Sequence, residues 1–243
     1  MSKSSDEISI HVAYPPVLVG QKRTDFSIPF GDKEMRGVEH LVGRDGDLDQ
    51  VHAALSGDGS RRAVVLSGLG GIGKTQLAIA YAKRHKDNYS AIFWVNIRDE
   101  SSAQQSFATI AKRILQYHPY APHLGSIDLA GSLDEVVNAV LAWLGDPDNR
   151  RWLVIYDNYD NPRVSGNDAP DAVDVQLFLP DAYQGSIIIT TRSTQVRNGR
   201  RIPVQKLANP QDGADILSKV SGRALSIEGR YASSRYDSVL TQV

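Results

Sequence analysis

One eight-residue string constrains this chain more than any other part of its sequence. Residues 68–75 read Gly-Leu-Gly-Gly-Ile-Gly-Lys-Thr. Glycines let a backbone turn tightly enough for successive N–H groups to point inward, and a helix that follows such a turn adds its positive N-terminus. The amine of Lys74 and the hydroxyl of Thr75 suit phosphate oxygens and magnesium. The string therefore predicts a phosphate-binding loop, with an ordinary glycine-rich turn as the alternative. The loop residues that we expect to contact a nucleotide are Gly68, Gly70, Gly71, Ile72, Gly73, Lys74 and Thr75.

The rest of the chain alternates between short apolar runs and segments with helical spacing. The expected strands cover residues 63–66, 91–95, 152–156, 185–191 and 202–204, and the expected helices cover 45–55, 77–86, 103–117, 133–144 and 214–220. Continuous apolar strands separated by helices predict an α/β fold, a parallel sheet with helices on both faces. Pro203 cannot donate a ladder hydrogen bond, so the last strand should lie at a sheet edge. Ser132 is the expected cap of the helix at 133–144, with Glu135 at capping-box spacing.

A carboxylate follows the third expected strand. Asp157 comes directly after five apolar residues, where it could hold magnesium together with Thr75, although an aspartate in this position can also be a helix cap. Asn158 follows it, and an amide cannot act as a general base. Asp160 is the nearest acid that could replace it. The sequence therefore favours a weak ATPase at most.

Polar side chains also stand at the tip of the fourth expected strand, in the run Thr190-Thr191-Arg192. The planar fork of an arginine suits two phosphate oxygens, so Arg192 could contact a terminal phosphate. An arginine after a strand is otherwise usually solvated. The candidate catalytic residues are Lys74, Asp157 and Arg192.

Charge and composition exclude several other classes. The formal net charge of the 243 residues is -1, which gives no electrostatic footprint for nucleic acid. The chain has no cysteine, so disulfides and thiolate metal sites are excluded. The first residues are polar, and no apolar run approaches membrane-spanning length. We therefore expect a cytoplasmic protein without a nucleic-acid or membrane partner.

Taken in order, these signals resemble the NB-ARC domain of STAND-type signalling ATPases, especially those of fungi. The matching segments are 42–44, 65–78, 92–96, 152–158 and 185–192, and the resemblance covers roughly residues 40–222. It implies a P-loop NTPase fold, with a parallel five-stranded sheet in which the strand that carries Arg192 separates the Walker A strand from the Walker B strand. It also implies that Arg192 lies beside the terminal phosphate. Val42 and Arg44 would lie by the adenine and ribose, and Gln76 would belong to the nucleotide-binding set.

Members of that family are switches, closed with ADP and opened by ATP, whose effector and repeat domains supply output and sensing. The resemblance implies an ATP/ADP- and magnesium-binding module for signal transduction of the kind used in innate immunity, with slow or no hydrolysis and possible homo-oligomerisation in the ATP state. The winged-helix histidine and the repeat array expected after residue 223 do not follow, and no effector precedes, so the chain looks truncated. We divide it into a flexible tail (1–25), a nucleotide-binding domain (26–208) and the start of a second, helical domain with an irregular tail (209–243).

Two other functions stay open at this point. A P-loop kinase would need an arginine-rich lid, for which residues 192–201 could serve, but no acid for a phosphate acceptor is visible. A degenerate scaffold that binds partners and no nucleotide is opposed by the intact Lys74, Thr75 and Asp157. Guanine nucleotides are disfavoured, because no Asn/Thr-Lys-x-Asp motif is present.

Overall fold

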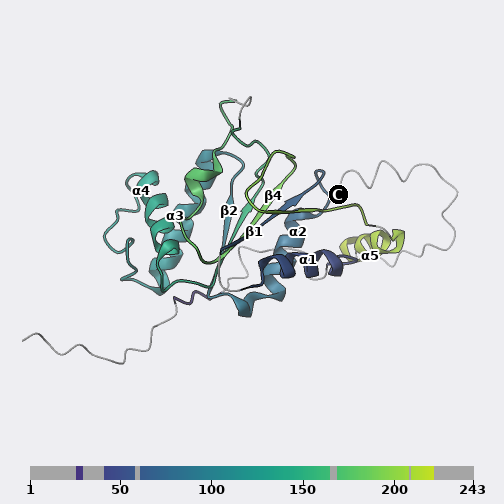
Figure 1. Ribbon diagram of the computed structural model, residues 1–243, viewed down its shortest axis with the longest axis horizontal. Coiled ribbons are helices and arrows are strands. Elements are labelled where there is room, and N and C mark those ends of the chain that lie inside the picture. Colours follow the sequence, from purple (N-terminus) through teal and green to yellow (C-terminus); the bar gives the residue numbers. More distant parts are fainter. Residues whose placement is uncertain (1–25, 30–40, 58–60, 165–168, 208, 222–243) are drawn as a thin grey trace, which may run out of the picture.

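The computed structural model describes residues 26–29, 41–57, 61–164, 169–207 and 209–221 (Figure 1). The tail expected at 1–25 lies outside the described residues, as does the part of the expected C-terminal unit (209–243) from residue 222 onward. The described part contains a five-stranded parallel sheet in the order β2-β3-β4-β1-β5. Its strands are β1 (Arg62–Ser67), β2 (Ala91–Asn96), β3 (Trp152–Asp157), β4 (Ser186–Thr191) and β5 (Arg200–Pro203). The expected α/β fold is confirmed.

The sheet order places the strands that carry the motifs side by side. Strand β4, which ends in Thr191, lies between β1, which leads into the phosphate loop, and β3, which ends in Asp157. This is the order that the family resemblance implied. Strand β5 pairs only with β1 and contains Pro203, so the prediction of an edge strand is also confirmed.

Helices cover both faces of the sheet (Figure 1). The helices are α1 (Asp45–Leu55), α2 (Lys74–Arg84), α3 (Glu100–Tyr117), α4 (Leu133–Gly145) and α5 (Pro210–Ser221), with short 3₁₀ turns η1 (Lys86–Asn88) and η2 (Val175–Phe178). Residues of α1 and α2 pack with Leu66 and Ile188 of the sheet. Residues of α3 and α4 pack with Val65 and Ile187, the chain neighbours of those two. Successive strand residues point to opposite faces of the sheet, and helices bury both faces. This explains why the strands are continuously apolar.

Segment 26–29 lies against the α3–α4 side of the sheet. The Ile28 amide donates to the Ser90 carbonyl at 2.7 Å, directly before β2. The ring of Phe26 meets that of Trp143 edge-on, with the centroids 5.7 Å apart. Ile28 is buried, so this segment contributes to the same core as α3 and α4.

Helices α2, α3 and α5 begin at residues 74, 100 and 210 rather than at 77, 103 and 214, and the capping of α4 also differs from the sequence prediction. Helix α3 begins at Glu100 rather than at residue 103, because the Asp99 side chain caps it by accepting from the Ser102 amide at 2.7 Å. Ser132 does occupy the N-cap position of α4, but its side chain makes no capping hydrogen bond. The predicted capping box is therefore wrong. The first turn of α4 instead contains the acids Asp134 and Glu135, whose negative charges interact favourably with the positive end of the helix dipole.

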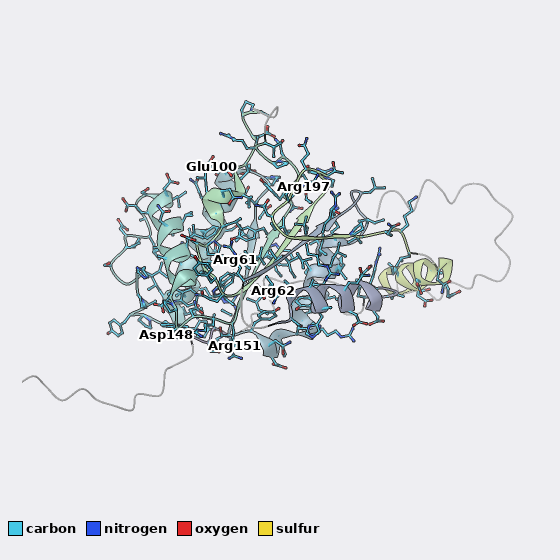
Figure 2. All side chains as sticks on the ribbon, viewed as in Figure 1. Arg61, Arg62, Glu100, Asp148, Arg151 and Arg197 are labelled. Atoms are coloured by element: carbon cyan, nitrogen blue, oxygen red, sulfur yellow. The ribbon has the colours of Figure 1, made fainter. Side chains whose placement is uncertain are left out.

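All strands run in one direction, so their carboxyl ends share one edge of the sheet. Glu100 follows β2 and Arg197 follows β4, and both lie toward the top of Figure 2. Asp148 and Arg151 precede β3 and lie toward the bottom. In open parallel sheets, ligands bind beyond the carboxyl ends of the strands. The phosphate loop, Asp157 and Arg192 all belong to this edge, which we call the carboxyl edge.

Candidate functional site

The glycine-rich loop joins β1 to α2, so it stands between a strand and a helix as the sequence predicted. A side chain at position 68 would place its Cβ 2.7 Å from the Val204 carbonyl oxygen, so only glycine allows the loop to lie this close to the segment after β5. Gly73 stands directly before α2 at φ +97, a left-handed conformation that favours glycine. A Cβ there would meet nothing within 4 Å. There is thus open space beside Gly73 at the N-terminus of α2, where backbone amides and the helix dipole attract anions.

Lys74 is nearly buried, at 9% exposure, and its amine stays inside the loop. The Nζ atom donates to the carbonyls of Gly68 and Leu69 at 2.9 and 2.8 Å. Burial lowers the pKa of Lys74; nearby Asp160 and Asp157 oppose this, and Arg192 adds to it. The amine therefore lies inside the loop, and its hydrogen-bond partners are two neutral carbonyl oxygens rather than a carboxylate.

Thr75 and Asp157, the residues predicted to hold magnesium, are in direct contact. The Thr75 hydroxyl donates to Asp157 Oδ1 at 2.9 Å, and the Thr190 hydroxyl donates to the same oxygen at 2.5 Å. Asp157 is only 5% exposed. Among the described residues no group of three or more His, Asp or Glu could hold a metal by itself. A threonine hydroxyl beside one carboxylate fits magnesium, which is usually held by one or two protein oxygens and completed by phosphate and water oxygens.

Amides rather than acids follow Asp157. Asn158 has a φ of +67, and its backbone N–H donates to the Thr190 hydroxyl at 3.1 Å. Its side-chain amide donates to Asn96 Oδ1, at the end of β2, at 3.3 Å. Neither carboxamide can accept a proton from water near neutral pH.

Arg192 lies close to the phosphate loop. A Cβ on Gly70 would be 3.6 Å from Arg192 Cδ and 3.9 Å from Nη1. Sequence reasoning missed the partner of this arginine. Asp160 Oδ1 accepts from the Arg192 backbone amide and Oδ2 accepts from Nε, both at 2.6 Å. Asp160 was considered as a substitute base, and the structure commits both of its oxygens to the arginine.

Arg44 is buried beside the loop and is held by protein oxygens. Its Nη1 donates to the Gln205 carbonyl at 2.7 Å and to Asp47 at 2.9 Å, and its Nη2 donates to the Ile72 carbonyl at 3.0 Å. It therefore ties the start of α1 to the phosphate loop and to the segment after β5. Val42 is half-buried two residues earlier. Arg44 thus lies beside the loop with its guanidinium bound to protein oxygens.

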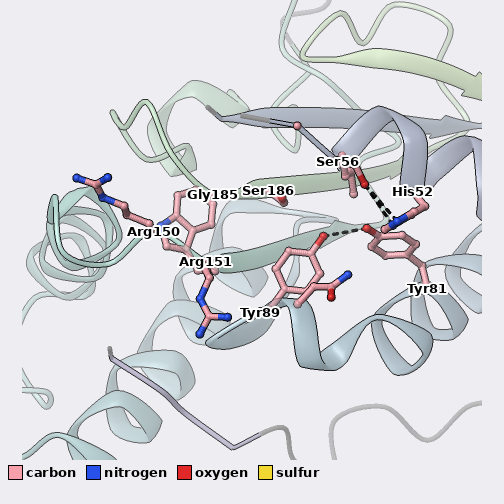
Figure 3. A pocket seen from close by; sticks show the side chains of 12 residues that line it. His52, Ser56, Tyr81, Tyr89, Arg150, Arg151, Gly185 and Ser186 are labelled. Carbon is pink, nitrogen blue, oxygen red and sulfur yellow. Dashed lines mark hydrogen bonds between the residues drawn. The ribbon is translucent and has the colours of Figure 1, made fainter. Parts of the chain in front are cut away.

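A separate cavity of about 170 Å³ lies at the opposite edge of the sheet (Figure 3). The Tyr81 and Tyr89 hydroxyls are hydrogen-bonded there at 2.9 Å, and burial raises the pKa of both groups. The imidazoles of His52 and His85 stack at 4.1 Å close by. The guanidinium of Arg150 points away from the tyrosine pair (Figure 3). None of the predicted site residues lines this cavity, so it is distinct from the site at the carboxyl edge.

Comparison with protein families agrees with the geometry of the carboxyl edge. The family model described as AAA ATPase domain matches residues 40–168, more than half of the 243 residues. The chain belongs to the AAA ATPase domain family. The matched range contains the phosphate loop, Thr75 and Asp157. This AAA ATPase domain is therefore a P-loop nucleotide-binding module.

One relative and one solved structure add detail. A "Nucleotide-binding leucine-rich repeat (NLR)-like protein" of Hyaloscypha variabilis is 28% identical over 200 residues, which are 77% of this chain and 18% of that protein. The AAA ATPase domain thus spans less than a fifth of that relative. The crystal structure of Cdc6p from Pyrobaculum aerophilum aligns with a TM-score of 0.46 and 15% identity over 81% of this chain and 54% of the other. Within the described residues, no helix has the length and apolar character needed to cross a bilayer.

Proposed function

We propose that this AAA ATPase domain is the ATP/ADP-binding switch module of a STAND-type signalling protein, with slow or no hydrolysis of ATP. The observation that carries the proposal is the convergence of Lys74, Thr75 and Asp157 at one edge, with a 2.9 Å bond between the Thr75 hydroxyl and the carboxylate. The relative is named a nucleotide-binding leucine-rich repeat-like protein, and this name supports a signalling context. In such a protein, effector and repeat domains would lie elsewhere in a longer cytoplasmic chain.

The predicted site residues would bind different parts of the nucleotide and its magnesium ion. The loop amides from Gly68 to Gly73 and the Lys74 amine would hold the phosphates, and Thr75 and Asp157 would hold magnesium. Magnesium, when bound, neutralises charge on the phosphate oxygens. Arg192 would meet the terminal phosphate. Val42, Arg44 and Gln76, which the family resemblance assigns to the nucleotide-binding set, would line the remaining part of the nucleotide site.

Slow hydrolysis follows from the side chains after Asp157. The positions nearest the Walker B aspartate carry Asn158 and its partner Asn96, which cannot remove a proton from water. Asp160 is occupied by Arg192. Bound ATP would therefore remain unhydrolysed longer than in an efficient ATPase, as a switch requires. Oligomerisation in the ATP state and a role in innate immunity extend the same proposal.

The test is nucleotide binding by the 243-residue chain and by Lys74→Ala, measured by titration with fluorescent ADP and ATP in magnesium buffer. We expect Lys74→Ala to weaken binding at least about tenfold, because it removes a charge-assisted contact with phosphate. Lys83→Ala is the matched control, since it removes the same charge from the other end of α2. Equal affinity of Lys74→Ala and the unmodified chain, or no binding by the unmodified chain, would contradict the proposal.

A further inference from the structure

The segments that leave β3 and β4 are tied together by hydrogen bonds beyond the sheet. The Tyr159 amide donates to the Thr190 carbonyl at 3.0 Å, and the Thr191 hydroxyl donates back to the Tyr159 carbonyl. The Thr190 hydroxyl accepts from the Asn158 amide while it donates to Asp157. These bonds place residue 160 opposite residue 192.

Asp160 makes the last contacts of this series, and its ionised carboxylate makes both of them charge-assisted. One carboxylate oxygen accepts from the Arg192 backbone and the other from the Nε atom of its guanidinium, both at 2.6 Å. The Asp160 amide also donates to the Asn158 carbonyl at 2.9 Å, which fixes the turn that carries the acid. Asp160 is 24% exposed, whereas Arg192 is 62% exposed. The carboxylate is therefore the more fixed partner, and it holds a side chain that would otherwise be free to move in solvent.

The orientation of the arginine follows from this contact. With Nε directed at Asp160, the Cδ–Nη1 side of the group lies over Gly70, 3.6 to 3.9 Å from where a Cβ would stand. The Lys74 amine lies in the same loop, bonded to the Gly68 and Leu69 carbonyls. A planar guanidinium fixed at Nε can present its remaining N–H groups to an oxygen without first losing side-chain freedom.

We propose that Asp160 is a positioning residue, which fixes Arg192 over the phosphate loop and thereby sets the preference of the site for a nucleoside triphosphate over the diphosphate. This inference rests on the proposed nucleotide-binding function. The proposed effect of Asp160 on the preference for ATP is opposite in sign to the effect of its negative charge alone. A carboxylate near the loop repels phosphate, and it repels the more charged triphosphate more strongly. Removal of Asp160 should strengthen ATP binding if only its charge acts, and should weaken ATP relative to ADP if it positions Arg192.

The experiment measures the affinities of the full chain for Mg-ATP and Mg-ADP by competition with a fluorescent nucleotide. The variants are Asp160→Asn, Asp160→Ala, Arg192→Ala and the double variant Asp160→Ala/Arg192→Ala. Asp87→Asn is the matched control, because it removes one exposed carboxylate from η1, at the opposite edge of the sheet. Melting temperatures without nucleotide show whether each variant is folded.

We expect Asp160→Ala to lower the ratio of ATP affinity to ADP affinity by about fivefold, since a partly exposed ion pair contributes modestly. Asp160→Asn, which keeps an acceptor for the Arg192 amide, should lower it less. In the Arg192→Ala background, loss of Asp160 should not lower the ratio further. Asp87→Asn should leave the ratio unchanged.

An unchanged or raised ratio in folded Asp160→Ala overturns the inference, as does an unchanged ratio in Arg192→Ala. An equal loss of affinity for both nucleotides also overturns it, because that is the effect of a purely structural residue. If the unmodified chain binds neither nucleotide, the proposed function itself fails. The two failures are therefore distinguishable.

Discussion

Replacement of Thr190 by valine tests the hydrogen-bond network of the carboxyl edge directly. The Thr190 hydroxyl donates to Asp157 Oδ1 at 2.5 Å and accepts from the Asn158 amide at 3.1 Å. Thr190 is 1% exposed and its bond to Asp157 is buried, so water cannot take the place of the hydroxyl beside that carboxylate. Valine has nearly the same shape, and the substitution therefore removes the hydroxyl without leaving a cavity.

The size of the effect follows from the two partners that are lost. Asp157 keeps the Thr75 donor, so its carboxylate loses one of two charge-assisted bonds. The backbone N–H of Asn158 is only partly buried, so it can donate to water instead. Together these losses should lower the free energy of unfolding by about 2 to 3 kcal/mol. Urea denaturation followed by circular dichroism gives the value, with Thr190→Ser as the control that keeps the hydroxyl.

The midpoint of the Thr190→Val transition should fall while its slope stays unchanged, which is the signature of a change in stability alone. A loss below about 0.5 kcal/mol would be ordinary for a surface substitution and would show that the bond to Asp157 is not formed in solution. An equally large loss in Thr190→Ser would show that packing, rather than the hydroxyl, is responsible.

Three further predictions concern other parts of the fold. Gly185→Ala should destabilise the domain by several kcal/mol, because Gly185 has a φ of +85 and a Cβ there would lie 2.2 Å from the Trp152 ring. The protein that remains folded should keep its nucleotide affinity, as measured by titration, since position 185 is at the opposite edge of the sheet. Burial, the neighbouring His52 ring and Arg84 lower the pKa of His85. The unfolded chain therefore binds more protons than the folded one, and stability should fall as the pH drops below about 6.5. The urea midpoints at pH 7.5 and pH 5.5 should differ less in His85→Gln than in the unmodified chain. Asn158→Asp should increase phosphate release from ATP, because it introduces a base beside Asp157, and an unchanged rate would show that the amide does not limit hydrolysis.

The strands were predictable because each is a continuous apolar run. The run at Trp152–Tyr156, for example, is buried on both faces of the sheet, and such a run leaves few alternatives. Hydrophobicity did not give the order of the strands. That order came from the resemblance to a family, and the pairing of β4 with both β1 and β3 confirmed it.

The local contacts of the site were less predictable, since they join residues far apart in sequence. Arg44 reaches the Gln205 carbonyl across 161 positions, and no periodicity encodes such a pair. The contact between Asp160 and Arg192 depends on how far β3 and β4 extend past each other, which the sequence does not specify. The available signal for this contact was that β3 and β4, which are parallel neighbours, both end in polar residues. Ser132 shows the converse, because a residue type that favours capping does not ensure that the capping bond forms.

Strand β5 bears on how several such domains could associate. It has only four residues, its Arg200 and Arg201 are exposed, and Pro203 offers no N–H to a further strand. Short length, positive charge and proline each oppose the addition of a strand from another molecule. Growth of a continuous intermolecular sheet along β5 is thereby disfavoured. An association of copies on this side of the sheet would therefore rely on helices and loops rather than on a shared sheet.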